Sequence, residues 1–198
     1  MRESEKLEEG EIGLHLSDVL QVSLFWFSRF ILLFFSNPWL SDVPRYFYYS
    51  KLFIVDGKLP YRDFSFEYSP VAFVFFLIPA LIHRLFAFKT MAAYRFLFSI
   101  FLLGFDWLLF RKFCSIKRVS SLGLVYLILT LASFPVLFDR FDLLMGFFLV
   151  WPFLGMRFGP ENRIAFSWGF GAAIKLISIP SLFFWLWNIG MRRRKRFV

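Results

Sequence analysis

The stretch "MAAYRFLFSIFLLGFDWLLF", residues 91–110, decides the fold class of this chain. Apolar side chains dominate it from end to end. A hydrocarbon layer about 30 Å thick is crossed by about 20 such residues in an α-helix. Because backbone groups surrounded by lipid have to form hydrogen bonds within their own segment, we expect this run to be helical.

The rest of the chain has the same character. Its 198 residues are 59% hydrophobic and include 32 Phe, and the mean hydropathy is +0.62. Further apolar runs lie at 19–35, 71–88, 121–138, 143–156 and 164–189. This composition predicts an all-α, multi-pass integral protein of the cell membrane, built as a polytopic helical bundle.

The charged residues indicate how the chain lies in that membrane. The net charge is +9, but Lys and Arg cluster at the ends of apolar runs, which favours contact with membrane lipid and not nucleic acid as a partner. We place the basic patches 111–118, 157–163 and 192–196 in the cytoplasm. The expected organisation is a cytoplasmic tail at 1–17, a transmembrane module at 18–191 and a basic cytoplasmic end at 192–198.

The same reasoning puts two polar segments on the opposite side of the membrane. These are a large first external loop, 37–70, and the acidic segment "DRFD", 139–142. The run 71–88 contains Pro79, His83 and Arg84, so we expect a juxtamembrane helix, although its apolar content also suits a span. The run 164–189 fits two short helices meeting at a buried break near Lys175, or one long span.

The external loop carries more chemistry than a connector needs. It holds four basic residues, four acidic residues and five of the seven tyrosines, and it includes "GKLPYRDFSFEYSP" at 57–70. Loops on one face of a helical scaffold are where binding sites are usually built. We therefore expect a recognition site in this loop.

Three motifs in the same order resemble the GT-C superfamily of polyprenyl-phosphate-dependent glycosyltransferases, in particular glycosyltransferase family 87 and mannosyltransferase-like members. The first comprises Asp42, Tyr46, "GKLPYRD" at 57–63 and "EYSP" at 67–70. The second is "FDRFDLLMGFFLVWPFLGM" at 138–156, and the third is "GFGAAIKLISIPSLFF" at 169–184. Members of this family usually continue through further spans, so the resemblance implies a truncated module or a partner subunit that supplies the missing spans.

The resemblance implies an inverting hexosyltransferase that takes a sugar from a polyprenyl-phosphate donor on the outer face. The acceptor would be a glycan, a lipid or a protein; the lipid-linked sugar is a co-substrate, and no cofactor is expected. Asp42 matches the family's acidic position near the acceptor and is the expected general base. Residues expected to bind substrate are Tyr46, Tyr61, Asp63, Glu67, Tyr68, Arg140, Asp142 and Lys175. Arg140 and Lys175 are the candidates for holding the leaving phosphate.

Simpler interpretations exist for most of these residues. Asp42 would suit a helix N-cap before Pro44. Tyr46 would also suit the lipid interface, where tyrosines collect. Glu67 would suit a cap for a helix starting near Pro70, and Asp63 would suit a pair with a loop arginine.

Charges inside the apolar runs need partners as well. Asp106 is expected to face the bundle interior, with a basic partner, and Arg29 is subject to the same cost of burial in lipid. Lys175 either lines the site or extends to the interface. A transporter or lipid flippase, or a non-catalytic membrane subunit of a split glycosyltransferase, is the alternative to an enzyme. The spacing of His15 and His83 indicates no metal site.

Overall fold

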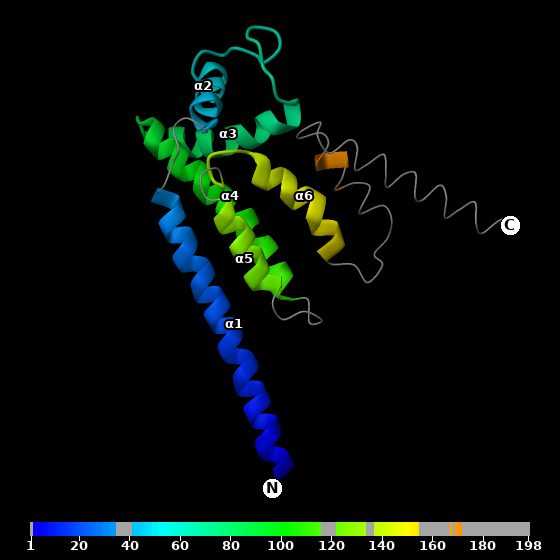
Figure 1. Ribbon diagram of the computed structural model, residues 1–198. Helices are drawn as coiled ribbons and strands as arrows, with labels where there is room; N and C mark the ends of the chain where they lie inside the picture. Colours follow the sequence, from blue (N-terminus) through cyan, green and yellow to red (C-terminus); the bar gives the residue numbers. More distant parts are fainter. Residues whose placement is uncertain are drawn as a thin grey trace, which may run out of the picture.

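The computed structural model of the protein describes residues 2–34, 41–115, 122–133, 137–154, 167 and 169–171 (Figure 1). Side chains are described from Asp18 onward, with the exception of 152–154. In this part of the chain every regular element is a helix, and the only bridge between extended residues is an isolated one between Pro60 and Phe64. The predicted all-α class is confirmed.

The six named helices are α1 (Arg2–Phe34), α2 (Val43–Ile54), α3 (Pro70–Leu85), α4 (Met91–Cys114), α5 (Leu122–Ala132) and α6 (Asp142–Leu154). Helix α1 starts far before the expected position 19, so the acidic segment and the apolar run form one helix. Helix α5 ends earlier than the expected residue 138, because 137–141 form a turn. Of the run 164–189 only 167 and 169–171 are described, and they are helical; Lys175 lies outside the described residues.

Helix α4 is the centre of the bundle and packs against α1, α2, α3, α5 and α6. The N-terminus lies at one end of the molecule, and α2 and α3 lie at the other (Figure 1). Helix α3 lies across that end, whereas α1 and α4 run steeply away from it (Figure 1). This crosswise orientation fits the predicted juxtamembrane helix.

By length and composition, α4 is the one helix in the described part of the chain that could cross a membrane. The other apolar helices there, Pro70–Leu85, Leu122–Ala132 and Asp142–Trp151, have 10–17 residues each. A multi-pass arrangement is therefore taken up below as part of the proposed function.

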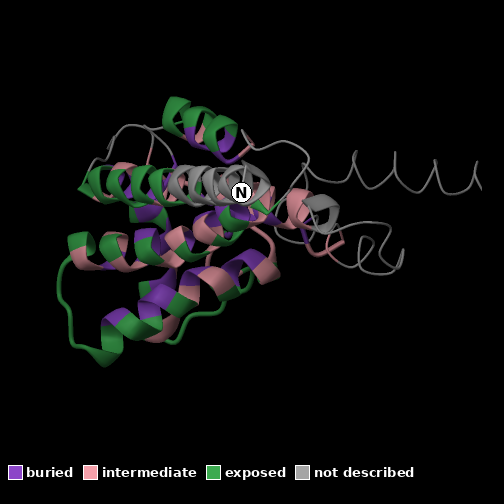
Figure 2. Ribbon diagram, turned by 90° about the horizontal axis from the view of Figure 1, so that it is seen from below, coloured by how far each residue is buried: buried purple, intermediate pink, exposed green. Residues whose placement is uncertain are grey.

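Helix α1 exposes large apolar side chains and buries one charged side chain. Its exposed side includes Phe27, which is 67% exposed, and Phe30, which is 64% exposed, whereas Arg29 is fully buried. Figure 2 shows how burial varies along the bundle, with buried residues inside and exposed ones on its outer faces. Exposed apolar side chains around a buried, paired charge are what a lipid environment favours.

The buried charge of α1 is neutralised by α4. Arg29 Nε lies 2.8 Å from Asp106 Oδ2, and both side chains are fully buried. The hydroxyl of Tyr126 donates to Asp106 Oδ1, and Arg29 Nη2 donates to Thr130 Oγ1. The expected basic partner of Asp106 is therefore Arg29, and the pair also fastens α5 to α1 and α4.

The single cysteine marks the opposite end of α4 from α2 and α3. Cys114 has a free, half-buried thiol that lies 3.7 Å from Gln21 Oε1 of α1. Gly123 of α5 lies so close to both side chains that a Cβ there would collide with them. The three helices thus meet tightly at this end.

Substituting Arg29 by Leu is expected to destabilise the fold strongly. Asp106 would remain buried without its cation, which typically costs about 3–5 kcal/mol of unfolding free energy. The double variant Arg29→Leu/Asp106→Leu is expected to recover most of that loss. Denaturant unfolding of the purified full chain in detergent measures both. Arg62→Leu, which breaks only an exposed pair, is the control that should leave the transition unchanged, and equal losses for the single and double variants would contradict the prediction.

Candidate functional site

An aromatic layer supports the first loop and the start of α2. Tyr46 is 1% exposed, and its ring stacks on Phe76 with the centroids 4.2 Å apart. Tyr68 packs edge-on against both rings, at 5.5 Å from Tyr46 and 5.3 Å from Phe76. Tyr46 therefore lies in the interior, and its interpretation as a lipid-interface tyrosine is wrong. Burial raises the pKa of Tyr46, and Tyr68 and Asp42 raise it further, so its hydroxyl keeps its proton and acts as a donor.

Asp42 occupies the N-cap position of α2, as the simpler interpretation of the sequence predicts. Its carbonyl accepts the backbone N–H of Tyr46 at 3.1 Å, and a proline follows within the first turn. Its carboxylate, however, makes no capping hydrogen bond. Instead, Oδ2 accepts the hydroxyl of Tyr46 at 3.4 Å. The side chain is thus available for a role other than starting the helix.

Arg140 lies between two carboxylates from different parts of the chain. Its Nε is 3.4 Å from Asp42 Oδ2 and 3.5 Å from Asp142 Oδ2. The Nε atom is buried without a well-formed hydrogen bond, while the side chain as a whole is 40% exposed. Among the described residues no hydrogen bond from the terminal N–H groups of Arg140 is present, so these donors can bind an anion. The first loop and the 139–142 segment, which the sequence places on the same side of the membrane, are therefore in direct contact.

Asp139 holds these two segments together. Its carbonyl accepts the backbone N–H of Asp42 at 3.1 Å. Its carboxylate, in a residue only 3% exposed, accepts Arg95 Nε at 2.9 Å and Ser41 Oγ at 3.3 Å. Arg95 also donates to the carbonyl of Leu33 at 3.4 Å. One arginine of α4 therefore fixes the end of α1 and the turn that carries Arg140.

Arg95 is absent from the residues that the sequence singled out. The signal that could have found it is the same one that points to Arg29: a cation within an otherwise apolar run needs a buried partner. The acidic segment 139–142 offers such a partner for Arg95.

Glu67 lies beside the aromatic layer and does not cap α3. Its Oε1 is 2.9 Å from Arg45 Nη1 and accepts the hydroxyl of Tyr49 at 3.2 Å. The cap of α3 is Ser69, whose Oγ accepts the backbone N–H of Ala72 at 3.1 Å. The capping interpretation of Glu67 is therefore wrong. The carboxylate of Glu67 raises the pKa of Arg45, which keeps this exposed pair charged.

Asp63 and Tyr61 organise the tip of the loop. Gly57 and Tyr61 have positive φ angles of 67° and 66°, which reverse the chain direction. Asp63 Oδ2 accepts the backbone N–H of Leu59 at 2.8 Å, and Arg62 donates to both carboxylate oxygens at 2.9 Å. The pairing of Asp63 with a loop arginine is confirmed. The hydroxyl of Tyr61 donates to the carbonyl of Tyr68. The substrate-binding roles of Tyr61, Asp63 and Tyr68 stay predictions.

The chemical capacity of the site follows from its geometry. A half-exposed carboxylate that is not used for capping can accept a proton from a hydroxyl within hydrogen-bonding reach. A guanidinium with unused donors can bind a phosphate next to it. Within the described residues, no group of three His, Cys, Asp or Glu side chains is arranged to hold a metal ion. Lys175, the other candidate for the phosphate, lies outside the described residues.

Comparisons of the chain with protein-family models, with curated proteins and with solved structures found no significant match.

The carboxyl group of Asp63 is expected to titrate with a pKa of about 2, because Arg62 and the backbone N–H of Leu59 stabilise its charged form. Since this value lies below the ordinary 3.8, the carboxylate contributes its stabilisation of the turn above pH 3.8 and loses it as the pH falls toward 2. The carboxyl ¹³C shift of Asp63 in the detergent-solubilised chain measures this. Arg62→Gln is expected to move the pKa up toward 3.8, and an unchanged titration would refute the cause.

Arg95→Met is expected to loosen the contact that places Asp42. Asp139 would lose its cation, and the backbone N–H of Asp42 would exchange with solvent faster, by about tenfold for a loss of about 1.4 kcal/mol in local stability. Hydrogen exchange followed by mass spectrometry of peptides covering 41–50 measures this. The matched control is Arg62→Met. It removes a cation from the first loop, and the ion pair of that cation is with its neighbour Asp63. Equal exchange in the two variants would show that Arg95 does not hold the segment.

Proposed function

We propose that this protein is an inverting membrane glycosyltransferase of the GT-C type, mannosyltransferase-like, which transfers a sugar from a polyprenyl-phosphate donor to an acceptor on the outer face. One observation carries this proposal. Asp42, which the sequence resemblance matches to the family's acidic position, lies with its carboxylate 3.4 Å from Arg140 Nε. A proton acceptor and an anion-binding group thus stand side by side at the end of the bundle where α2 and α3 lie.

The two groups divide the reaction between them. The acceptor hydroxyl gives its proton to Asp42 while its oxygen bonds to the anomeric carbon from the face opposite the phosphate. The bond between that carbon and the phosphate oxygen breaks, and its electron pair stays on the lipid phosphate. The terminal N–H groups of Arg140 stabilise this charge as it develops. The protonated Asp42 then returns its proton to solvent.

The neighbouring residues have supporting roles in this proposal. Tyr46 positions the carboxylate of Asp42, and Asp142 shares the guanidinium of Arg140. Glu67, with Tyr68 and Tyr61 beside it, offers carboxylate and hydroxyl groups of the kind that recognise sugar hydroxyls. Asp63 shapes the loop that carries them.

The membrane setting of the proposal has its own support. In this proposal α4 crosses the bilayer, the apolar runs 19–35, 121–138 and 143–156 provide further crossings, and α3 lies along the outer surface with α2 above it. The exposed apolar side of α1 and the internal Arg29–Asp106 pair fit a lipid environment. A donor whose sugar is carried on a polyprenyl chain would reach Arg140 from the lipid between helices.

Transfer of radiolabelled sugar from polyprenyl phosphates, in membranes that carry the full chain, tests the proposed function. Asp42→Asn is expected to reduce transfer about 10²- to 10⁴-fold, the usual contribution of a general base. Arg140→Met is expected to reduce it about 10²- to 10³-fold, as the loss of one charge-stabilising donor does. Asp56→Asn, which changes an exposed carboxylate of the same loop, is the control and should stay within about twofold.

The outcomes separate the competing functions. Equal transfer by the wild type and Asp42→Asn would remove Asp42 as the base. No transfer by the wild type with any polyprenyl-phosphate sugar would overturn the proposed activity for this chain. Movement of the intact lipid-linked sugar across the membrane would then identify a flippase, and transfer that appears only with a co-expressed partner would identify a subunit.

A further inference from the structure

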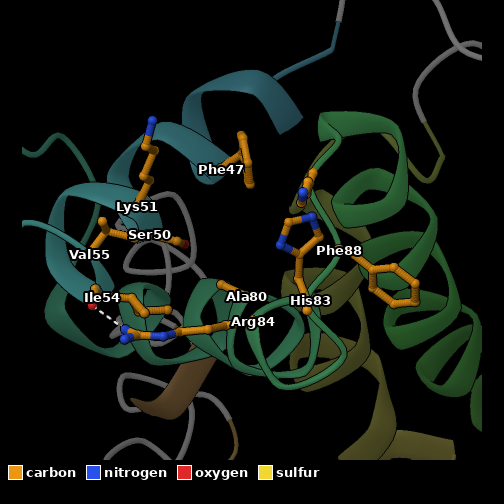
Figure 3. Close-up of a pocket in the computed structure, with 11 residues that line it drawn as sticks. Phe47, Ser50, Lys51, Ile54, Val55, Ala80, His83, Arg84 and Phe88 are labelled. Atoms are coloured by element: carbon orange, nitrogen blue, oxygen red, sulfur yellow. Dashed lines mark hydrogen bonds between the residues drawn. The ribbon is translucent and has the colours of Figure 1, made fainter.

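A cavity lies away from Asp42 and Arg140, between the C-terminal half of α2 and the end of α3. Its volume is about 390 Å³. It is lined from α2 by Phe47, Ser50 and Lys51, and from α3 by Ala80, His83 and Arg84. Figure 3 shows Phe47 and Lys51 on the α2 side of this space and His83 and Phe88 on the other side. The turn at 86–89 closes it, so the cavity belongs to the layer that lies across the end of the bundle.

The charge around this cavity is of one sign. Three cations line it, Lys51, Arg84 and Lys89, and none of the residues that line it is a carboxylate. Neither lysine forms an ion pair within the described residues. Arg84 donates to the carbonyl of Ile54 at the end of α2, which fixes its guanidinium at the rim without neutralising it. Such a rim attracts an anion and discriminates against a cation.

Aromatic rings line part of the interior of the cavity. The rings of Phe47 and His83 lie 5.4 Å apart, and His83 is 8% exposed. Its Nε2 bonds to the carbonyl of Thr90 at 3.0 Å, so it is held in place from α4's N-terminus. Phe88 packs against His83 with the centroids 5.9 Å apart. An occupant must therefore combine an anionic group with an apolar part.

Exposed apolar side chains stand at the rim of this cavity. Val55 and Phe88 line it and are 63% and 45% exposed, and Phe86, in the turn that closes it, is 65% exposed. On α3 an exposed stripe of Val74, Ile78, Leu81 and Leu85 recurs every three or four positions, on the side of the helix turned away from the cavity. A helix with such a stripe and with basic residues at its end has the composition of helices that lie in the membrane interface. In that setting the cations of the cavity lie at the level of the phospholipid headgroups.

We propose that this cavity binds the headgroup phosphate of an anionic phospholipid of the surrounding bilayer. Lys51, Lys89 and Arg84 hold the phosphate, and the acyl chains leave the cavity past the exposed side chains of Phe86 and Phe88. Lys51 follows Asp42 by nine residues of helix, which is about 13 Å along the axis. The lipid is therefore distinct from the sugar donor placed at Arg140, and its binding needs the membrane location but not the transferase activity. It secures the α2–α3 layer against the membrane surface.

Retention of phosphatidylglycerol by the full chain tests this. The chain is purified in nanodiscs of phosphatidylcholine containing phosphatidylglycerol as one lipid in five, and bound lipids are counted by native mass spectrometry after release into detergent. Wild type is expected to retain phosphatidylglycerol selectively. Lys51→Gln/Lys89→Gln is expected to weaken that retention about tenfold or more, because each basic residue near an anionic lipid surface contributes about a fivefold factor.

Two controls separate a specific site from general attraction and from the donor site. Lys58→Gln/Arg62→Gln removes the same charge from the loop tip, outside the cavity, and should retain the lipid as the wild type does. Asp42→Asn should retain it as well, even if it abolishes transfer. Equal retention of phosphatidylglycerol and phosphatidylcholine, or equal losses in the two double variants, would overturn the proposal.

Polyprenyl phosphate added in competition tests which lipid the cavity takes. We expect it to leave phosphatidylglycerol in place. One-for-one displacement, lost in Lys51→Gln/Lys89→Gln, would make the cavity a site for the polyprenyl lipid and would also overturn the proposal. A chain that binds phosphatidylglycerol but transfers no sugar would leave this inference standing and refute the proposed function alone.

Discussion

The arrangement of the candidate site depends on one buried carboxylate, that of Asp139. Burying a carboxylate costs several kcal/mol unless it is paired and hydrogen-bonded, and Arg95 and Ser41 together meet that requirement. The pairing fixes the turn before α6 relative to α4, and the carbonyl of the same residue then receives the N–H of Asp42. Asp42 lies next to Arg140 because its backbone N–H bonds to the carbonyl of Asp139, and Arg140 is the next residue in the chain.

The ion pairs of the described structure differ in how many of their polar atoms have hydrogen-bond partners. This difference distinguishes pairs that stabilise the bundle from pairs that can bind a ligand. Arg29–Asp106 is fully buried, and Tyr126 and Thr130 complete its hydrogen bonds. Such a pair has no room for a ligand and acts within the bundle. Arg140 is different, because its contacts with two carboxylates are long and it is 40% exposed. A ligand that offers better acceptors gains more there than at a saturated pair.

The aromatic residues of the first loop have a structural role, because they form the buried interior of the layer at the end of the bundle. Tyr46, Tyr68 and Phe66 form the interior between α2, α3 and α4, where a small layer outside the bundle has little other apolar material to bury. Ser50 of α2 and Tyr94 of α4 both donate to the carbonyl of Phe76 in α3. These two hydrogen bonds hold α3 across the end of the bundle. The cavity lined by Lys51, Arg84 and Lys89 lies beside them.

The sequence by itself determined the helical class, the approximate helices and the local contacts. The pairing of Arg62 with Asp63 and the N-cap position of Asp42 were predictable because they join residues only a few positions apart, whose geometry the backbone sets. The position of Asp106 within an apolar run also predicted a basic partner for its carboxylate. Only the tertiary structure decided that this partner is Arg29, 77 residues away, that Arg95 holds Asp139, and that Tyr46 is buried and Ser69, not Glu67, caps α3. The reason is that such pairings depend on how far each helix is rotated and how closely it packs, and side-chain volumes from distant segments fix both together.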